Sequence, residues 1–229
     1  MRSGTLVVNG SLASPVSVEA GGLLGGTGIV GSTSVAGRIA PGNSIGTLTV
    51  AGNLVLQPGS VTVMEVQGAA ADRINVSGTA ALAGTLQLVP IGTSFTFNTP
   101  FVLVNATGGR TGSFDAVSTT GTFGPGVNPL IALTPTGVSL VLQPQALGPT
   151  LAPDEPTNVV NVTNALDSRS GDANPFFGVL NAPAGQTRAA ARQLTGEAGT
   201  APAAISQQAA SQFLAAMLDG SRLRRGERS

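Results

Sequence analysis

The stretch Arg38–Leu56, RIAPGNSIGTLTVAGNLVL, contains the pattern that decides the fold. A Pro-Gly-Asn turn leads into apolar residues spaced along a strand, Ile45, Leu48 and Val50. A second glycine turn follows, and a new apolar run begins at Leu54. Glycine supplies tight turns, and alternating apolar residues are typical of half-buried strands. The stretch therefore predicts short strands joined by glycine turns, and the same pattern fills the first two-thirds of the chain.

Two short motifs recur along this region. Val-x-Gly starts at four positions and Gly-Thr-Leu at three: Val8, Val35, Val50, Val76, and Gly4, Gly46, Gly84. Self-similarity with a period of about 20 residues, or twice that, is the signature of a solenoid. The uneven spacing indicates a degenerate repeat.

The strands that this pattern predicts are short, and apolar residues alternate with Thr, Ser and Asn along them. A parallel β-helix fits better than a β-sandwich, because its narrow core favours Val, Leu, Ile and Ala over large aromatic side chains. The predicted strands are Leu6–Val8, Val16–Glu19, Gly28–Val30, Ser34–Val35, Thr47–Val50, Leu54–Gln57, Val61–Val66, Ile74–Ser77, Ala80–Leu82 and Thr85–Val89.

The pattern predicts four regions. Residues 1–92 are degenerate β-helix coils, and longer strands with Phe residues at 93–144 predict a hairpin-rich cap. Residues 145–156 form a Pro-rich linker. Residues 157–229 read as a short α-helical segment, with Thr157 as the N-cap of a helix over 158–168 and further helices over 187–194 and 201–219.

Composition excludes several classes of function. The chain has 229 residues, 32 Gly, 10% charged residues and zero net charge. It contains no Cys, His, Trp, Tyr or Lys. We therefore expect no nucleic-acid partner, because no basic patch precedes the C-terminal tail and base-stacking aromatic residues are nearly absent. With no His or Cys, we also expect no metal site and no cofactor.

Two motifs resemble functional sites. Gly42–Gly46 fits the G-x-S-x-G pattern of a hydrolase nucleophile elbow, but serine activation needs a base and the chain has neither His nor Lys. We interpret it as a structural turn in which Asn43 bonds its own backbone. Gly26–Gly31 fits G-x-G-x-x-G, yet no helix or acidic residue follows at the spacing of a dinucleotide site, so a glycine-rich corner is the better interpretation.

Acid pairs leave one enzymatic alternative, a polysaccharide-cleaving β-helix. Glu65 and Asp72 lie close in sequence across an Ala-rich turn, and glycoside hydrolysis needs two nearby carboxylates. Sugar-stacking Trp and Tyr are absent. We instead interpret Asp72 as a turn cap beside Arg73 and expect no enzymatic activity.

An ordered set of motifs resembles one family. The set comprises IAPGNSIGTLTVAGNLVLQPGS, DRINVSGTAALAGTLQL, FVLVNATGGRTGSFDAV and, after the linker, ALDSR, AARQLTGEA and FLAAMLDGSRLR. In this order they are similar to the C-terminal passenger region of type V autotransporter outer-membrane proteins. The resemblance covers about residues 25–225.

The resemblance implies a right-handed parallel β-helix stalk, an autochaperone-like end that folds first outside the outer membrane, and helices leading to a translocator barrel. That barrel would be the partner, with a host or neighbouring-cell ligand as a second, at the cell surface or after secretion. Without a signal peptide or barrel, we expect the chain to be a fragment or a truncated product. A surface adhesin remains an alternative. The positions expected to matter are structural: Pro41, Gly42, Asn43, Gly46, Leu48, Val50, Gly52, Asp72, Gly78, Gly84 and Gly112.

Overall fold

The computed structural model describes residues 1–124, 126–148, 153–168 and 186–194. These residues are mostly β, in three sheets with few helices. The predicted helix over 201–219 lies outside the described residues. None of the helices in the described part of the chain combines the length and the apolar character needed to cross a membrane.

The first sheet contains β1 (Ser3–Val7), β4 (Gly21–Gly26), β7 (Arg38–Pro41), β10 (Val61–Gly68), β14 (Thr85–Phe95) and β17 (Ala116–Thr119), in that order, with β11 (Ala70–Ala71) paired to β10. The second contains β2 (Ser11–Leu12), β5 (Ile29–Val30), β8 (Thr47–Val50), β12 (Arg73–Val76), β15 (Pro100–Ala106), β19 (Gly137–Pro144) and β18 (Val127–Thr134). The third contains β3 (Val16–Val18), β6 (Thr33–Val35), β9 (Leu54–Leu56), β13 (Ala80–Leu82) and β16 (Arg110–Gly112).

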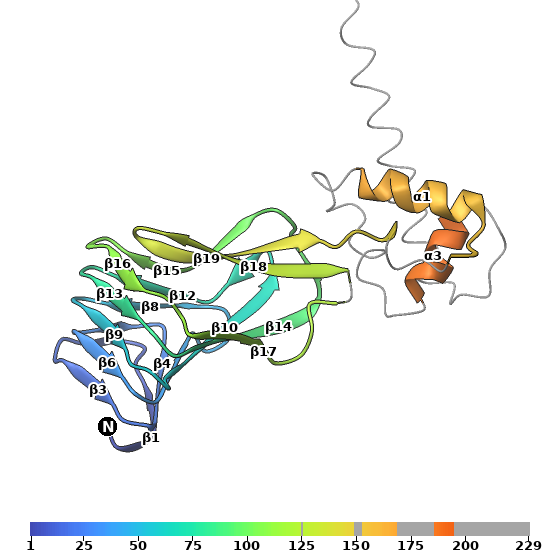
Figure 1. Ribbon diagram of the computed structural model, residues 1–229. Coiled ribbons are helices and arrows are strands. Elements are labelled where there is room, and N and C mark those ends of the chain that lie inside the picture. Colours follow the sequence, from blue (N-terminus) through green and yellow to red (C-terminus); the bar gives the residue numbers. More distant parts are fainter. Residues whose placement is uncertain (125, 149–152, 169–185, 195–229) are drawn as a thin grey trace, which may run out of the picture. The chain divides into compact units, whose positions relative to one another are not determined.

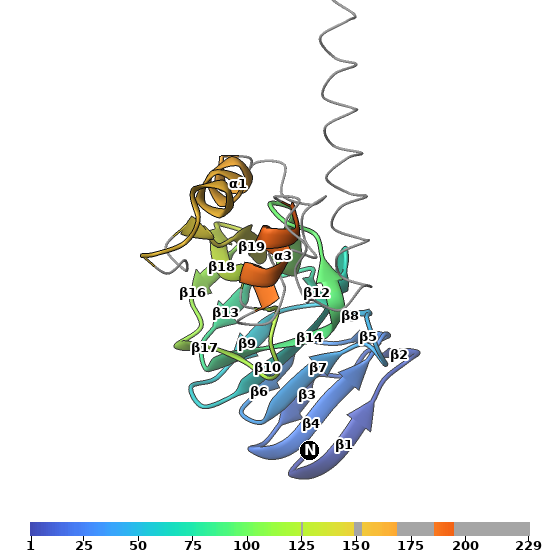
Figure 2. The ribbon, with the colours of Figure 1, turned by 90° about the vertical axis from the view of Figure 1, so that its right-hand side faces the viewer.

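The chain visits the three sheets in turn, so spatial neighbours in a sheet belong to successive coils. The neighbours β3, β6, β9, β13 and β16 follow chain order in Figure 1, and β1, β4, β7 and β10 do so in Figure 2. Pairing between successive coils is parallel in this region, for example Thr49 with Asn75 and Asn75 with Asn105, whereas β11 pairs antiparallel with β10. This topology is consistent with the predicted parallel β-helix.

The coils lengthen along the chain. In the third sheet, Val16 pairs with Thr33, 17 residues later, whereas Ala80 pairs with Arg110, 30 residues later. This growth explains why the sequence repeat is irregular. The pairing itself stays in register, because added residues enter the turns and strand extensions rather than the paired segments.

Alternating side chains fill the interior. On β8, Leu48 and Val50 are fully buried while the two threonines are half-buried. Val50 pairs with Val30 on one side and Val76 on the other, so apolar side chains of successive coils stack in a column. Fully burying one such side chain contributes about 1.5–3 kcal/mol.

Four strands were missed by sequence reasoning: β2, β4, β7 and β11. β4 has the sequence GGLLGG, and β7 ends at Pro41, the first residue of the predicted Pro-Gly-Asn turn. Glycine has low strand propensity, but β4 lies between β1 and β7 with buried glycines. A Cβ at Gly25 would lie 3.0 Å from the Ala40 carbonyl oxygen, so close contact between backbones explains these glycines.

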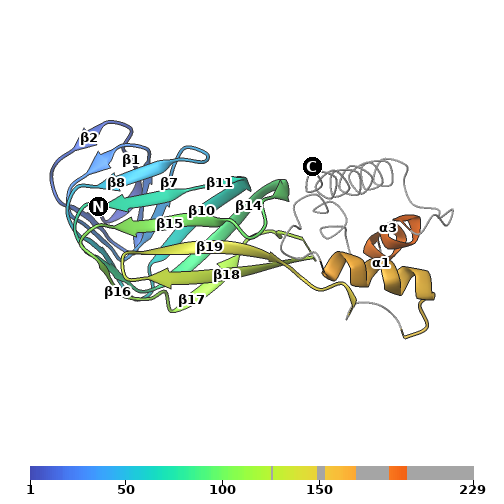
Figure 3. The same cartoon turned by 90° about the horizontal axis from the view of Figure 1, so that it is seen from above.

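The last strands change direction. β15 pairs in parallel with β12 and antiparallel with β19, and β18 lies at the edge beside β19 (Figure 3). The boundary predicted at residues 92 and 93 falls inside β14. The described chain forms two compact units, one of residues 1–92, 99–122 and 130–141, and the other of the remaining described residues. The predicted domain limits remain predictions.

The second of these units contains α1 (Thr157–Asp167) and α3 (Gln186–Leu194). The prediction of Thr157 as an N-cap is wrong, because Pro156 occupies the cap position and makes no side-chain hydrogen bond. Proline is favoured near a helix start since its missing N–H needs no partner there. Asp167 at the end of α1 accepts the N–H groups of Leu147 and Gly148 at 2.7 and 2.9 Å.

Two buried positions, Ser60 and Thr62, carry a hydroxyl without a described partner. Thr62 on β10 pairs with Ile39, is fully buried, and its Oγ1 makes no hydrogen bond with another described residue. Thr62→Val keeps the shape and removes the polar atom, so we expect the free energy of unfolding to rise by about 1 kcal/mol in urea titrations.

Thr33→Val is the matched control. Thr33 is equally buried, but its Oγ1 donates to the Gly31 carbonyl oxygen at 2.8 Å. This variant should lose stability. A gain for Thr33→Val, or a loss for Thr62→Val, would contradict the assignment of the two hydroxyl groups.

Candidate functional site

The sequence-predicted positions fall mainly in turns between sheets. Pro41 ends β7, Gly42, Asn43 and Gly46 form the turn before β8, and Leu48 and Val50 point inward from β8. Gly52 follows β8, Asp72 lies between β11 and β12, Gly78 between β12 and β13, Gly84 directly before β14, and Gly112 ends β16. Their structural importance remains a prediction.

The structure brings Gly42, Gly46 and Asp72 together with Glu65, a set called the Asp72 cluster below. Asp72 Oδ1 accepts the Gly46 N–H at 2.8 Å and Oδ2 accepts the Glu65 N–H at 2.9 Å. The Arg73 N–H returns a bond to the Gly46 carbonyl at 2.9 Å. One carboxylate thereby fixes the turn of one coil against the hairpin of the next.

Gly42 is required by this arrangement. Its φ is +87°, and a Cβ there would lie 2.0 Å from the Ser44 carbonyl oxygen and 2.8 Å from Asp72 Oδ1. Any side chain would therefore displace the turn or the carboxylate.

Burial dominates the electrostatics of Asp72. The residue is 1% exposed, and burial raises the pKa of its carboxyl from the ordinary 3.8 to about 6. The two backbone N–H groups lower the pKa, and the charge of Glu65 raises it further. Near neutral pH the group is still mainly ionised, so it acts as a charged acceptor.

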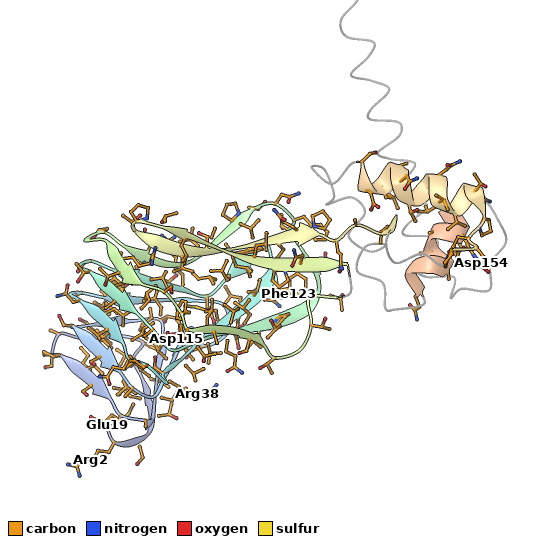
Figure 4. All side chains as sticks on the ribbon, in the orientation of Figure 1. Arg2, Glu19, Arg38, Asp115, Phe123 and Asp154 are labelled. Carbon is orange, nitrogen blue, oxygen red and sulfur yellow. The ribbon has the colours of Figure 1, made fainter. Side chains whose placement is uncertain are left out.

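A second carboxylate, that of Asp115, also accepts the N–H of a turn glycine. Asp115 Oδ2 accepts the Gly84 N–H at 2.6 Å, and the Asp115 N–H donates to the Gly84 carbonyl at 2.7 Å. We call Gly84 and Asp115 the Asp115 cluster; Figure 4 labels Asp115. Both Gly46 and Gly84 begin a Gly-Thr-Leu motif. Sequence reasoning did not assign this role to Asp115; the available signal was an Asp directly before a strand, one coil after a Gly-Thr-Leu motif.

At other turns between sheets, asparagine side chains accept the backbone N–H groups. Asn9 Oδ1 accepts the Thr27 N–H at 3.2 Å and Asn43 Nδ2 at 3.0 Å. Asn53 Oδ1 accepts the Thr79 N–H at 2.9 Å. The Asn43 side chain therefore bonds to a neighbouring coil, which differs from the predicted bond to its own backbone.

The two motif resemblances have structural explanations. Ser44, in the G-x-S-x-G turn, is exposed with a φ of 146°, and the chain has no His or Lys to serve as a base. Gly26–Gly31 contains strand β5 rather than the start of a helix, and a Cβ at Gly28 would lie 2.1 Å from the Gly10 carbonyl oxygen. Close packing of adjacent coils accounts for that glycine.

Both oxygens of Asp72 are engaged by backbone N–H groups, whereas Glu65 Oε2 is buried without a hydrogen-bond partner in the described residues. Across those residues no group of three or more acidic, His or Cys side chains could hold a metal ion. The arrangement of the Asp72 cluster is thus suited to fixing backbone groups.

Comparison with known proteins gives one partial match of interest. No protein-family model matches the chain. A stretch of 68 residues is 43% identical to part of a protein called extracellular serine protease from Serratia marcescens. The match covers 29% of this chain and 6% of that protein, so the chain corresponds to a small part of its relative's length.

Asp72→Asn should lower the free energy of unfolding by about 1–3 kcal/mol in urea titrations. An amide offers one acceptor oxygen, so its NH₂ would face either the Gly46 or the Glu65 N–H. Glu19→Gln is the control, because Glu19 is exposed and its carboxylate accepts a 3.3 Å bond from Ser17 Oγ and no other hydrogen bond from the described residues. Equal stability of the two variants would contradict the role assigned to the Asp72 carboxylate.

The stability of the wild-type chain should depend on pH through Asp72. Since the folded-state pKa of about 6 lies above the ordinary 3.8, the folded chain binds the proton more tightly than the unfolded chain. The contribution of Asp72 to the free energy of unfolding should be largest below about pH 4, fall as pH rises through about 6, and then level off. Urea midpoints across this range measure the effect.

The difference between wild type and Asp72→Asn isolates this contribution. The stabilising effect of the carboxyl should change between about pH 4 and pH 6 and stay constant above about pH 7. A difference that is constant across the whole range would show that Asp72 has the same pKa in the folded and unfolded chains.

Proposed function

We propose that the chain is the C-terminal part of an autotransporter passenger, an autochaperone-like end of a right-handed parallel β-helix followed by an α-helical linker. Its role is to nucleate β-helix folding and to connect a surface stalk to an outer-membrane barrel. The observation that carries the proposal is the stacking of successive coils in three sheets. Similarity to part of an extracellular protein supports an exported location, at the cell surface or after secretion.

The distribution of the corner contacts supports a folding role. The Asp72 and Asp115 clusters fix the longer, C-terminal coils with charged acceptors. At the first Gly-Thr-Leu motif, Gly4 pairs with Gly22, where the sequence offers no Asp. A parallel strand pairs most readily with a sheet edge that is already ordered, because only the incoming strand then loses conformational entropy. The C-terminal coils would supply that edge.

The proposed role is non-catalytic. The chain has no His, Lys or Cys, so Ser44 has no side-chain base of the usual kinds. Both Asp72 oxygens hold backbone N–H groups, which supports a structural role over an acid pair with Glu65. The proposed partner is an outer-membrane β-barrel outside this chain.

A binding function is the second candidate, with a host or neighbouring-cell ligand as the partner. A trough of about 310 Å³ lies on the third sheet and favours it. Its lining combines hydroxyl and amide groups with apolar side chains: Pro15, Val16, Ser17, Ser32, Thr33, Ser34, Asn53 and Val55.

A display experiment tests the folding role. The full chain is placed between upstream β-helix coils carrying an epitope and an outer-membrane barrel, and folded display is measured by epitope labelling and protease resistance on intact cells. Gly84→Ala should reduce both, because φ is +76° and a Cβ would lie 2.3 Å from the Ser60 carbonyl oxygen. Positive-φ strain and the clash together should destabilise the coil by about 2 kcal/mol or more.

Gly10→Ala is the matched glycine control, because a Cβ there meets nothing within 4 Å and φ lies outside the left-handed region. It should display normally. Normal display of Gly84→Ala in a chain shown to be destabilised in vitro would overturn the folding role, as would full display after deletion of residues 1–144.

A further inference from the structure

The geometry points to a chemical modification site at Asn9. We propose that Asn9 deamidates in the folded chain by attack of the Gly10 backbone nitrogen on the Asn9 side-chain amide, and that two hydrogen-bond donors on Asn9 Oδ1 promote the reaction. The site lies in the turn between β1 and β2, where Asn9 contacts Asn43 in the turn that belongs to the Asp72 cluster. The proposal does not depend on the function proposed above.

The nucleophile is unhindered. Gly10 is exposed and carries no Cβ, and the space where a Cβ would stand contains no atom within 4 Å. Its carbonyl oxygen accepts the Ile29 N–H at 2.8 Å, whereas its own N–H makes no hydrogen bond to another described residue. The nitrogen is therefore anchored beside the side chain and free to react, which gives the intramolecular attack its advantage over a bimolecular one.

The electrophile is polarised. Asn9 Oδ1 accepts hydrogen bonds from the Thr27 N–H at 3.2 Å and from Asn43 Nδ2 at 3.0 Å. Attack at Cγ places negative charge on this oxygen, and donors already aimed at the oxygen stabilise that charge, as in an oxyanion hole. Asn9 is also exposed, so its side-chain nitrogen can leave into water as ammonia.

The reaction balances with water as the only co-reactant. The Gly10 nitrogen forms a bond to Asn9 Cγ and loses its proton to water, while the Cγ–Nδ2 bond breaks and Nδ2 leaves as ammonia with a proton from water. The product is a cyclic imide. Water then adds to one of its two carbonyls and opens the ring, which leaves either aspartate or isoaspartate at position 9. No oxidation or reduction occurs.

Asn53 is an internal control within the chain. Its Oδ1 likewise accepts two bonds, from the Thr79 N–H at 2.9 Å and Thr79 Oγ1 at 3.2 Å. The next residue is Leu54, which is fully buried and whose N–H donates to the Thr79 carbonyl at 2.9 Å. A nitrogen held in this way is unavailable for attack, so Asn53 should keep its amide.

The sequence allows a clean measurement. Because the chain has no Lys, trypsin releases residues 3–38, and Asn9 is the single amide side chain in that peptide. The folded full-length chain is incubated at neutral pH, digested, and the peptide is analysed by mass spectrometry with chromatographic separation of aspartate and isoaspartate. Aspartate and isoaspartate should accumulate at Asn9. In the peptide of residues 39–73, Asn53 should keep its side-chain amide.

Two variants separate the parts of the mechanism. Gly10→Ala should slow the conversion in both the folded and the urea-unfolded chain, because a methyl group hinders the nucleophile. Asn43→Ala should slow it several-fold in the folded chain only, less than the roughly 10²–10³ that an enzyme loses with one oxyanion-hole donor, since this site is open to water. Far-UV circular dichroism and urea midpoints verify that each variant is folded.

Three results would contradict this mechanism. An intact Asn9 in the folded chain, over a time in which the isolated peptide 3–38 converts, would show that the fold protects the site. An unchanged folded-state rate for Asn43→Ala would remove the role of the donors. Equal conversion at Asn53 and Asn9 would remove the role of Gly10.

Discussion

The structure depends on acceptors for the backbone N–H groups where the chain turns from one sheet to the next. Within the sheets, parallel neighbours satisfy these groups. At the turns, side chains do so, and Asp72 takes the Gly46 and Glu65 N–H groups with its two oxygens. A charged acceptor makes a stronger bond than a neutral one, and burial strengthens it further. The same burial disfavours the charge, which is why the pKa of Asp72 is raised.

Two kinds of acceptor are distributed unevenly along the chain. Neutral amides accept backbone N–H groups at Asn9, in an early coil, and at Asn53, which joins the same two coils as Asp72. Carboxylates do so only from those coils onward, at Asp72 and Asp115. Charged hydrogen bonds thus fix the coils that are longest and that have the most chain to order. This distribution agrees with a proposed order of folding that begins in the C-terminal coils.

The recurring Val-x-Gly and Gly-Thr-Leu motifs predicted stacked coils, and the alternation of apolar residues predicted which side chains are buried. Both features can be read along the chain without knowledge of the contacts. The columns through Leu48 and Val50 follow from them directly. β4 could not be found in this way, since GGLLGG has no strand propensity and is explained only by the neighbouring backbones. The Asp115 cluster was missed for a related reason. Its two partners are separated by a whole coil whose length varies, so spacing alone does not pair Gly84 with Asp115.

The unequal coils have a consequence for the evolution of such a chain. In an array of identical repeats, one unit can be duplicated, lost or shifted by a full period, and the neighbours still fit. Here the step between paired strands changes from 17 residues at Val16 to 30 at Ala80, so each coil matches only the two beside it. Recombination between coils would leave mismatched turns, and divergence should therefore proceed by substitution and by small insertions at the corners rather than by gain or loss of whole coils.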